Sequence, residues 1–293
     1  MIIKMKPVLV QKEVWGGHKI KDNFGYIDAP DRCGEAWGIS AHKTFSSVIA
    51  NTSFKGMTLR ELFNNNKELF GNYEGEEFPI LVKIIDARDN LSIQVHPNDD
   101  YAKQFKSLGK EECWYVLDTN EYTEIIIGHK AKTKEELHKA IDQDRIEDLV
   151  NAFPIKKGDF FYINAGTLHA ICKGTTLLEV QQSSDITYRV YDYNRLQDDG
   201  TLREIHKGKA KDVITVPDNR VNKIHRDRYF TYDIIQNNTL TKEVSHKHGD
   251  YIFILEGEGL FDKVPVRIGD FLMVSSSTEY KIYGTLKYQK TTF

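Results

Sequence analysis

The segment Lys157-Gly158-Asp159-Phe160-Phe161-Tyr162-Ile163 decides the fold, because it recurs later in the chain as Ile268-Gly269-Asp270-Phe271-Leu272-Met273-Val274. In both segments a Gly-Asp-Phe triplet leads into a run of aromatic and aliphatic residues, which is typical of the start of a β-strand. Further upstream, Cys113-Trp114-Tyr115-Val116-Leu117-Asp118 aligns with Tyr251-Ile252-Phe253-Ile254-Leu255-Glu256. The repeat predicts two copies of one small β-barrel or double-sheet unit.

Outside the repeat, we predict short strands separated by turns, together with two helical segments. Thr58-Leu59-Arg60-Glu61 and Thr133-Lys134-Glu135-Glu136 each fit a capping box, in which Thr and Glu side chains satisfy backbone N–H groups at the start of a helix. We expect helical insertions over about 56–70 and 133–153, the second ending where Phe153-Pro154 stops its apolar stripe. Together they are expected to form one helical hairpin or pair inserted into the β-rich body.

A length of 293 residues suits one large or two modest domains. We predict a first domain over residues 1–215 and a second over residues 216–293. The boundary is expected near Val216-Pro217-Asp218, just after a loop that contains His206-Lys207-Gly208-Lys209. The fold class is therefore mainly β, with the helical insertions in the first half of the chain.

Composition indicates an ordinary globular protein, with 40% hydrophobic and 28% charged residues. The formal net charge of -3 gives no general attraction to nucleic acid or acidic membranes. We find no apolar run long enough to span a bilayer and no signal peptide. Three cysteines without a CxxC pair argue against a disulfide framework and against cysteine-ligated structural zinc. We expect a reduced, cytoplasmic protein.

The candidate site is built from four residues that could converge in a small barrel. In Gln94-Val95-His96 the pattern alternates, so both polar side chains lie on one face of a strand. Glu112 belongs to the next strand-like segment, and His169 follows a strand and an Ala-Gly turn. Each residue alone has an ordinary structural interpretation, such as a packed histidine or a solvated glutamate. Two imidazoles and a carboxylate that converge beside an open position would form a catalytic site for a divalent metal.

The second copy of the repeat lacks part of this set. When Gly158 is aligned with Gly269, Tyr280 takes the place of His169, and Asp250 falls opposite Glu112. His246 and His248 alternate as Gln94 and His96 do, but without the distal histidine we interpret them as surface or structural residues. A complete second metal site is not expected.

Several motifs together resemble the type I mannose-6-phosphate isomerases, a family of zinc-dependent cupins. The matching motifs span roughly residues 10 to 215, and the chain resembles the short bacterial form of the family. A weaker second cupin follows this region in the sequence. The motifs are Gln94-Val95-His96-Pro97, Gly109-Lys110-Glu111-Glu112-Cys113-Trp114, Ala165-Gly166-Thr167-Leu168-His169, Trp15-Gly16-Gly17, Gly34-Glu35-Ala36-Trp37-Gly38-Ile39-Ser40-Ala41-His42 and Ser183-Ser184-Asp185-Ile186-Thr187-Tyr188-Arg189. The family implies two cupin-like jelly-roll β-barrels, the second one degenerate.

The same resemblance assigns roles to individual residues. It implies one zinc ion per chain, with the ligands Gln94, His96, Glu112 and His169. Arg189 becomes a catalytic arginine, and the pocket is lined by Lys83, Ser92, Lys110 and Glu179, of which Lys110 and Glu179 are candidate catalytic residues. Asn98-Asp99 stands where longer relatives often carry a basic residue, so this chain lacks that residue at one place where the family could contact a phosphate or a reacting group.

Elementary chemistry is consistent with these roles but leaves alternatives open. Moving a proton between C1 and C2 of a sugar through a cis-enediol needs stabilisation of a developing oxyanion and an acid–base group. Glu179 could carry the proton if burial raises its pKa, or it could pair with Arg189 structurally. Arg189 could hold phosphate or an enediolate, or form a salt bridge with Asp185 or Asp192. Trp15, Trp37 and Trp114 could line a sugar pocket or pack in the core.

The predicted function is interconversion of mannose 6-phosphate and fructose 6-phosphate by a monomer or weak homodimer that binds a small sugar phosphate. One rival is a cupin dioxygenase, in which two histidines and a carboxylate hold Fe(II). The other is a non-catalytic cupin that binds a sugar phosphate. Iron with oxygen uptake would support the first rival, and tight binding without turnover would support the second.

Overall fold

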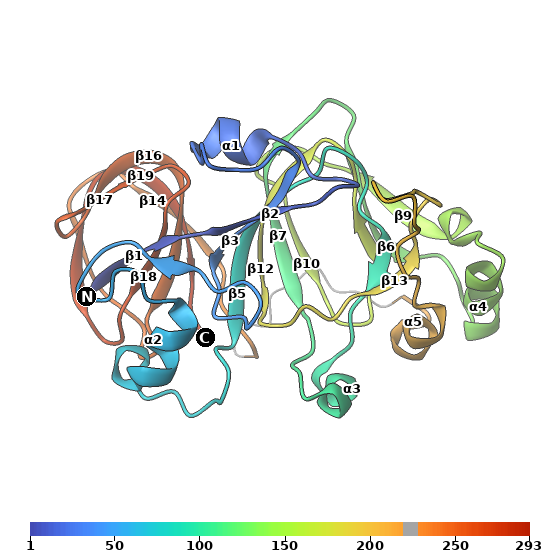
Figure 1. The fold of residues 1–293 in the computed structure, drawn as a ribbon, viewed down its shortest axis with the longest axis horizontal. Coiled ribbons are helices and arrows are strands. Elements are labelled where there is room, and N and C mark those ends of the chain that lie inside the picture. The colour runs from blue at the N-terminus through green and yellow to red at the C-terminus, as the bar shows by residue number, and fades with distance from the viewer. Residues whose placement is uncertain (219–227) are drawn as a thin grey trace.

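The computed structural model describes residues 1–218 and 228–293, which form three β-sheets arranged along the longest axis of the molecule (Figure 1). The C-terminal sheet has the order β14 (Asp233–Asn237), β19 (Glu279–Thr291), β16 (Asp250–Phe261), β18 (Phe271–Val274), β1 (Ile2–Lys6) and β4 (Val48–Ile49), with β15 (Thr241–Val244) on β19 and β17 (Val264–Arg267) on β16. The middle sheet has the order β10 (Phe160–Ile163), β7 (Glu112–Thr119), β12 (Thr175–Gln182), β5 (Ile80–Asp86), β3 (Cys33–Ile39) and β2 (Val8–Gln11). The third sheet has the order β13 (Tyr188–Tyr191), β6 (Ile93–Val95), β11 (His169–Ile171), β8 (Glu124–His129) and β9 (Val150–Pro154).

The middle sheet is buried on both faces, because alternate residues of its strands enter two different cores. Ile85, Trp114 and Leu177 pack with Ile125 and Ile171 of the third sheet. The intervening side chains pack against the C-terminal sheet in a second core that includes Ile84, Cys113, Leu178, Tyr251 and Phe271. Every residue of β3, β5 and β12 is buried, which is why these strands carry almost no exposed polar positions.

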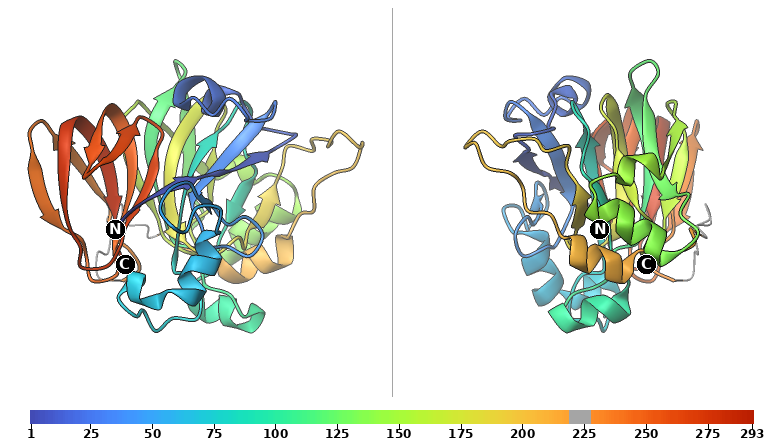
Figure 2. Two further views of the ribbon diagram at one scale, coloured as in Figure 1. Left: turned by 60° about the vertical axis from the view of Figure 1, so that its left-hand side comes forward. Right: turned by 90° about the vertical axis from the view of Figure 1, so that its right-hand side faces the viewer.

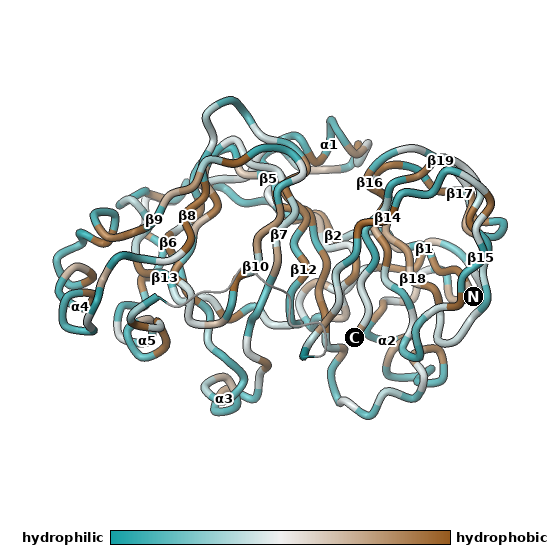
Figure 3. Tube along the Cα trace, turned by 180° about the vertical axis from the view of Figure 1, so that it is seen from behind, coloured by the Kyte–Doolittle hydropathy of each residue, from teal (hydrophilic) through white to brown (hydrophobic). Residues whose placement is uncertain are grey.

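Helices cover the outer face of the third sheet and the ends of the molecule. The helices are α1 (Lys19–Phe24), α2 (Leu59–Asn65), α3 (Asp99–Ala102), α4 (Lys134–Asp142) and α5 (Lys207–Val213), with 3-10 turns over Lys67–Phe70, Lys103–Phe105 and Ile146–Asp148. Figure 2 shows α4 and α5 in front of the third sheet, where Leu137, Ile141 and Ala210 pack onto strand residues such as Val95 and Val190. Hydrophobic segments follow the strands, and hydrophilic ones follow the outer connections (Figure 3).

The internal repeat is confirmed in atomic detail. Gly158 has φ 92° and Gly269 has φ 90°, a backbone conformation that glycine adopts at little cost. Gly158 N donates to the Val116 carbonyl at 2.8 Å, and Gly269 N donates to the Ile254 carbonyl at 2.9 Å. The strands that follow each turn pair in the same register, because Ile163 lies opposite Glu112 and Val274 lies opposite Asp250. Asp250 is therefore the counterpart of Glu112, as the sequence predicted.

Both predicted helix starts are confirmed, but a full capping box forms only at Thr58 and Glu61, because the Glu136 side chain accepts from Lys132 N and not from Thr133 N. The helical prediction is wrong in three further details. α2 and α4 lie at opposite ends of the molecule and do not form a pair (Figure 1). Residues 150–153 belong to strand β9, which pairs with β8, so the apolar stripe of the predicted helix ends as one edge of a sheet. Apolar spacing over so few residues fits either structure, and pairing with β8 decides between them. The expected loop at His206-Lys207-Gly208-Lys209 instead contains the start of α5.

Strands from both predicted domains share the C-terminal sheet. β1 and β4 lie before the predicted boundary at residue 216, and β1 pairs with β18 of the C-terminal unit. The division into 1–215 and 216–293 stays a prediction about separate folding units, and residues 219–227 lie outside the described part of the chain. Within the described residues, no helix is long and apolar enough to cross a membrane. Cys33, Cys113 and Cys172 are all free thiols, as expected.

Candidate active site

The four predicted metal-site residues are brought together by strand register. His169 begins β11 and lies directly opposite Gln94 of β6. His96 follows the last residue of β6, and Glu112 begins β7 in the facing middle sheet. Directly opposed residues of an antiparallel pair point to the same face, so Gln94 and His169 both face the middle sheet. The two sheets thus place imidazoles on one side and a carboxylate on the other.

The cluster of His96, Glu112 and His169 has the geometry of a potential metal site. One ligand atom from each residue lies within 4.8 Å of the others. His96 Nε2 is 3.5 Å from Glu112 Oε2, and His169 Nε2 is 3.5 Å from Glu112 Oε1. All three side chains are 1% exposed. Among the described residues, this is the one group of His, Cys, Asp and Glu side chains with such spacing.

Hydrogen bonds fix both imidazoles with Nε2 toward the cluster. His96 Nδ1 donates to the Ile186 carbonyl at 2.8 Å, and His169 Nδ1 donates to the Thr167 carbonyl at 2.9 Å. Burial lowers the pKa of His96 well below its ordinary value, and the charge of Lys110 lowers it further. Burial also lowers the pKa of His169 to about 4. Both rings are therefore neutral at pH 7, and each directs an Nε2 lone pair into the cluster, where Lys110 Nζ lies 3.0 Å from His96 Nε2 and Gln94 Nε2 lies 3.4 Å from His169 Nε2.

Gln94 and Ser92 lie beside this cluster. Gln94 Nε2 is 3.4 Å from His169 Nε2, and Gln94 Oε1 accepts a hydrogen bond from Ser92 Oγ at 3.2 Å. The amide thus reaches the cluster, but ligation through Oε1 requires the amide to turn about its terminal bond. Glu112 Oε2 is a buried oxygen without a well-aligned hydrogen bond, although Lys110 Nζ lies 2.9 Å away. The approach of a cation stabilises such a buried oxygen, because it replaces the hydration that the oxygen lost on burial.

Lysines and glutamates alternate through the middle sheet next to the cluster. Lys110 Nζ lies 3.0 Å from His96 Nε2 and 3.9 Å from Glu179 Oε1. Lys83 Nζ lies 3.2 Å from Glu179 Oε1. All three of Lys83, Lys110 and Glu179 are buried, so their charges interact in a medium that screens them weakly. The predicted pocket residues therefore form one connected charge network with the potential metal ligands.

The buried Glu179 carboxyl lies between an indole and two lysines. Burial raises the pKa of Glu179, and the negative charge of Glu112 raises it further, whereas Lys83 and Lys110 oppose the shift. Trp114 Nε1 donates to Glu179 Oε2 at 3.0 Å, which fixes the carboxyl plane. The alternative interpretation, a structural pair between Glu179 and Arg189, is wrong, because the partners of Glu179 are lysines and an indole.

Arg189 lies on the same sheet face as Gln94, its direct partner across β13 and β6. It lines a pocket of about 660 Å³ together with Lys12, Trp15 and Arg203. The expected alternative of a salt bridge with Asp185 or Asp192 is not found. Asp185 lies 3.6 Å from His42, and Asp192 accepts hydrogen bonds from Arg195 and Arg203. Within the described part of the chain the Arg189 guanidinium has no ion pair, so it is available to an anionic ligand.

Sequence reasoning did not single out Glu35 and Lys12, which extend the charge network. Glu35 Oε1 accepts from Lys83 Nζ at 3.0 Å, and Glu35 Oε2 lies 2.8 Å from Lys12 Nζ. Trp37 and Trp114, left open between pocket and core, donate their indole N–H groups to Glu35 and Glu179. The available signal was the alternation of Glu35 and Trp37 in an otherwise apolar strand.

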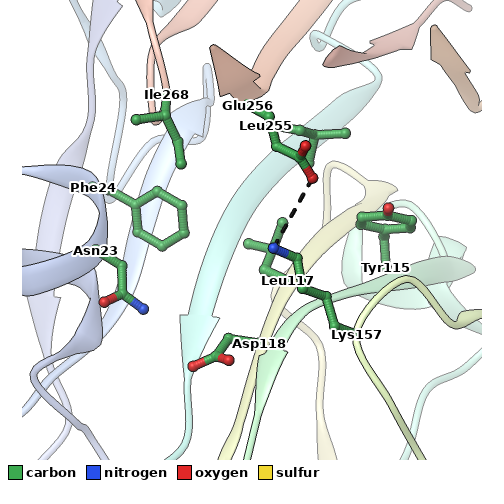
Figure 4. A pocket seen from close by; sticks show the side chains of 9 residues that line it. All are labelled: Asn23, Phe24, Tyr115, Leu117, Asp118, Lys157, Leu255, Glu256 and Ile268. Carbon is green, nitrogen blue, oxygen red and sulfur yellow. Dashed lines mark ion pairs between the residues drawn. The ribbon is translucent and has the colours of Figure 1, made fainter. Parts of the chain in front are cut away.

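A second pocket, of about 430 Å³, lies away from these residues (Figure 4). It is lined by residues such as Phe24, Tyr115 and Ile268, and none of the predicted site residues contributes to it. Lys157 and Glu256 face each other across its edge, with Nζ and Oε1 4.0 Å apart. The pocket carries no cluster of groups that could hold a metal.

Comparison with known proteins agrees with the geometry of the site. The family model for the type I phosphomannose isomerase catalytic domain matches residues 2–138. Mannose-6-phosphate isomerase ManA of Bacillus subtilis is 49% identical over 214 residues, which cover 72% of this chain and 67% of that protein. The mannose-6-phosphate isomerase of Streptococcus mutans is 48% identical over 208 residues, 71% of this chain and 66% of that protein. A crystal structure of the mannose 6-phosphate isomerase from B. subtilis, 39% identical, matches with a TM-score of 0.93 over 100% of this chain and 99% of that one. The chain therefore belongs to the type I mannose-6-phosphate isomerases, a family of metal-dependent aldose–ketose isomerases with a cupin-type fold.

Proposed function

We propose that the chain interconverts mannose 6-phosphate and fructose 6-phosphate, with one zinc ion in the cluster of His96, Glu112 and His169. Gln94 would complete the ligand set through its Oε1. The observation that carries the proposal is the position of Glu179. The Glu179 carboxyl has a raised pKa, and Lys110 lies between it and the buried cluster of two neutral imidazoles and a carboxylate. A potential metal site and an acid–base group thus lie next to each other, joined through Lys110, as aldose–ketose isomerisation requires.

The donor set suits zinc. Two imidazole nitrogens and one carboxylate, with a fourth position for an amide or a substrate oxygen, are typical of catalytic zinc sites. When bound, zinc supplies Lewis-acid stabilisation for negative charge that develops on a substrate oxygen. The hydrogen bonds from His96 Nδ1 and His169 Nδ1 to backbone carbonyls keep both rings oriented for this task.

The remaining steps fall to residues of the chain. Glu179 would take the proton from C2 or C1 and return it to the neighbouring carbon, while a proton passes between O1 and O2 of the enediol in the same direction. Lys83 and Lys110 would donate hydrogen bonds to substrate oxygens, while Ser92 would position the Gln94 amide that it already contacts. Arg189, which forms no ion pair with any carboxylate in residues 1–218 and 228–293, would hold the anionic part of the substrate with its planar fork.

Membership in an isomerase family argues against both rivals, the iron dioxygenase and the non-catalytic binding protein. We retain the predictions of a cytoplasmic protein that is a monomer or weak homodimer, and analytical ultracentrifugation tests the association state.

Zinc analysis and a coupled assay for fructose 6-phosphate test the proposal. The zinc-loaded protein should turn over mannose 6-phosphate. His96→Ala should lose both zinc and turnover while keeping the circular dichroism spectrum. His18→Ala is the matched control, because His18 is an exposed histidine on the N-terminal side of α1. An active His96→Ala protein would refute the ligand assignment, and an inactive zinc-loaded wild-type protein would refute the function.

A further inference from the structure

Glu35 is a buried carboxylate for which the mechanism above has no task. It lies on β3, two strands from Glu179, and its side chain is 8% exposed. Lys12 Nζ and Trp37 Nε1 lie 2.8 and 3.1 Å from Oε2, and Lys83 Nζ lies 3.0 Å from Oε1. A buried charge persists in a protein when such partners compensate for its lost hydration. The arrangement is therefore built around a permanent negative charge at Glu35.

The surroundings exclude Glu35 as a base. Both of its oxygens already accept from a lysine, and one accepts from an indole as well. Burial alone would raise the pKa of Glu35, but the charges of Lys83 and Lys12 lower it far below the ordinary value. A carboxylate held in this way does not exchange protons near neutral pH. Its effect must pass through the groups that it holds.

Lys83 is the group that connects Glu35 to the site. Its ammonium lies between two carboxylates on the flanking strands, Glu35 on β3 and Glu179 on β12. The Trp37 ring, 5.2 Å from Nζ, closes a third side. A lysine side chain has four rotatable bonds, so two opposed carboxylates restrict it much more than one would. Glu35 is the second carboxylate paired with Lys83, so without it the ammonium would be drawn toward Glu179 alone.

We propose that Glu35 is a positioning residue of the isomerisation, which anchors Lys83 at a fixed distance from Glu179. This inference rests on the proposed function, in which Glu179 moves the proton. In the anchored state Lys83 stays shared, and Glu179 keeps an oxygen that can take a proton from the substrate. When the anchor is lost, Lys83 pairs fully with Glu179, and the carboxylate becomes a weaker base in a wrong orientation.

Glu35→Gln keeps the shape of the side chain and removes the charge. We expect kcat to fall by about tenfold to hundredfold, the usual effect of removing an outer partner of a catalytic group. KM should change less than kcat, because Glu35 itself makes no substrate contact in this scheme and affects substrate binding only through Lys83. With mannose 6-phosphate deuterated at C2, the isotope effect on kcat should be at least as large as in wild type. A smaller isotope effect would mean that proton transfer is not the step affected, and it would overturn the proposal.

A double-mutant cycle shows whether Glu35 acts through Lys83. The variant that combines Glu35→Gln with Lys83→Met should be no slower than Lys83→Met alone. Losses that multiply would overturn the proposal, as would a raised KM with unchanged kcat. Glu243→Gln is the matched control, since Glu243 is a lysine-paired carboxylate in the C-terminal unit. If zinc-loaded wild type does not isomerise the substrate, the proposed function fails. If wild type is active and Glu35→Gln is equally fast, this inference alone fails.

Discussion

Replacing Tyr280 by Phe tests how the second unit of the repeat is held together at the place where the first unit has its histidine. Tyr280 is buried, and its hydroxyl lies 2.9 Å from both Glu243 Oε2 and Asp250 Oδ2. Asp250 is the counterpart of Glu112, so a hydrogen-bonded network stands where the first unit has its potential metal ligands. Tyr288 and Lys290 also contact Glu243, at 3.1 and 2.8 Å.

The expected loss of folding stability follows from the single proton on the Tyr280 hydroxyl. One hydroxyl can donate to only one of the two carboxylates at a time, so Tyr280→Phe removes one charge-assisted hydrogen bond, worth about 1.5–3 kcal/mol. Phe keeps the ring, so no cavity beyond the volume of the hydroxyl is created. For a chain of this length the loss corresponds to a fall in Tm of roughly 3 to 6 °C.

Thermal unfolding followed by circular dichroism measures the effect. Tyr283→Phe is the control, because Tyr283 lies on the same strand but is 37% exposed, and we expect a change below about 0.5 kcal/mol. The isomerase activity of folded Tyr280→Phe protein should equal that of wild type. An unchanged Tm would show that the network does not stabilise the unit, and a loss of zinc would show that the C-terminal unit takes part in metal binding.

Three further predictions concern the catalytic unit. In metal-free protein, the folded pKa of His169 (about 4) lies below the unfolded value of about 6.5, so only the unfolded state gains this proton between these limits. His169 alone should lower the stability to urea by roughly 3 kcal/mol from pH 6.5 to pH 4, and His96, whose pKa is also lowered, should add to the fall. A flat profile would contradict the burial argument. Arg189→Gln should lower kcat/KM by at least about tenfold while leaving Tm nearly unchanged, because Arg189 has no ion pair among the described residues; a large fall in Tm would reveal a structural role. Glu179→Gln should lower kcat by about a hundredfold or more at unchanged zinc content, and a variant that retains wild-type kcat would assign the proton transfer to another group.

The architecture was predictable from the sequence where local signals are strong. The Gly-Asp-Phe repeat requires the same turn twice, because Gly158 and Gly269 both need positive φ, and the strands that follow are rich in β-formers. The threonines at 58 and 133 cap helices as predicted, with side chains that accept from the N–H groups of Glu61 and Glu136. The extent of the second helix was not predictable, because the apolar positions after residue 145 suit a strand as well.

The partners of individual site residues could not be predicted from the sequence. Arg189 has acidic neighbours in the chain, but Asp192 is taken by Arg195 and Arg203. Glu35 and Glu179 are 144 positions apart and share Lys83 only because β3, β5 and β12 are adjacent. Such pairings depend on sheet order, which local patterns do not encode.

By itself the sequence determined which side chains share a face: alternation in Gln94-Val95-His96 and the register of the repeat follow from the period of two in a β-strand. It also determined that the second unit lacks the distal histidine, because Tyr280 aligns with His169. Only the tertiary structure decided which faces meet. By stacking the middle sheet between two others, the fold removes water from both of its faces and leaves Lys83, Lys110 and Glu179 to be neutralised by one another. Burial of charges is a property of the packed sheets, and the charge network around the potential metal site arises from it.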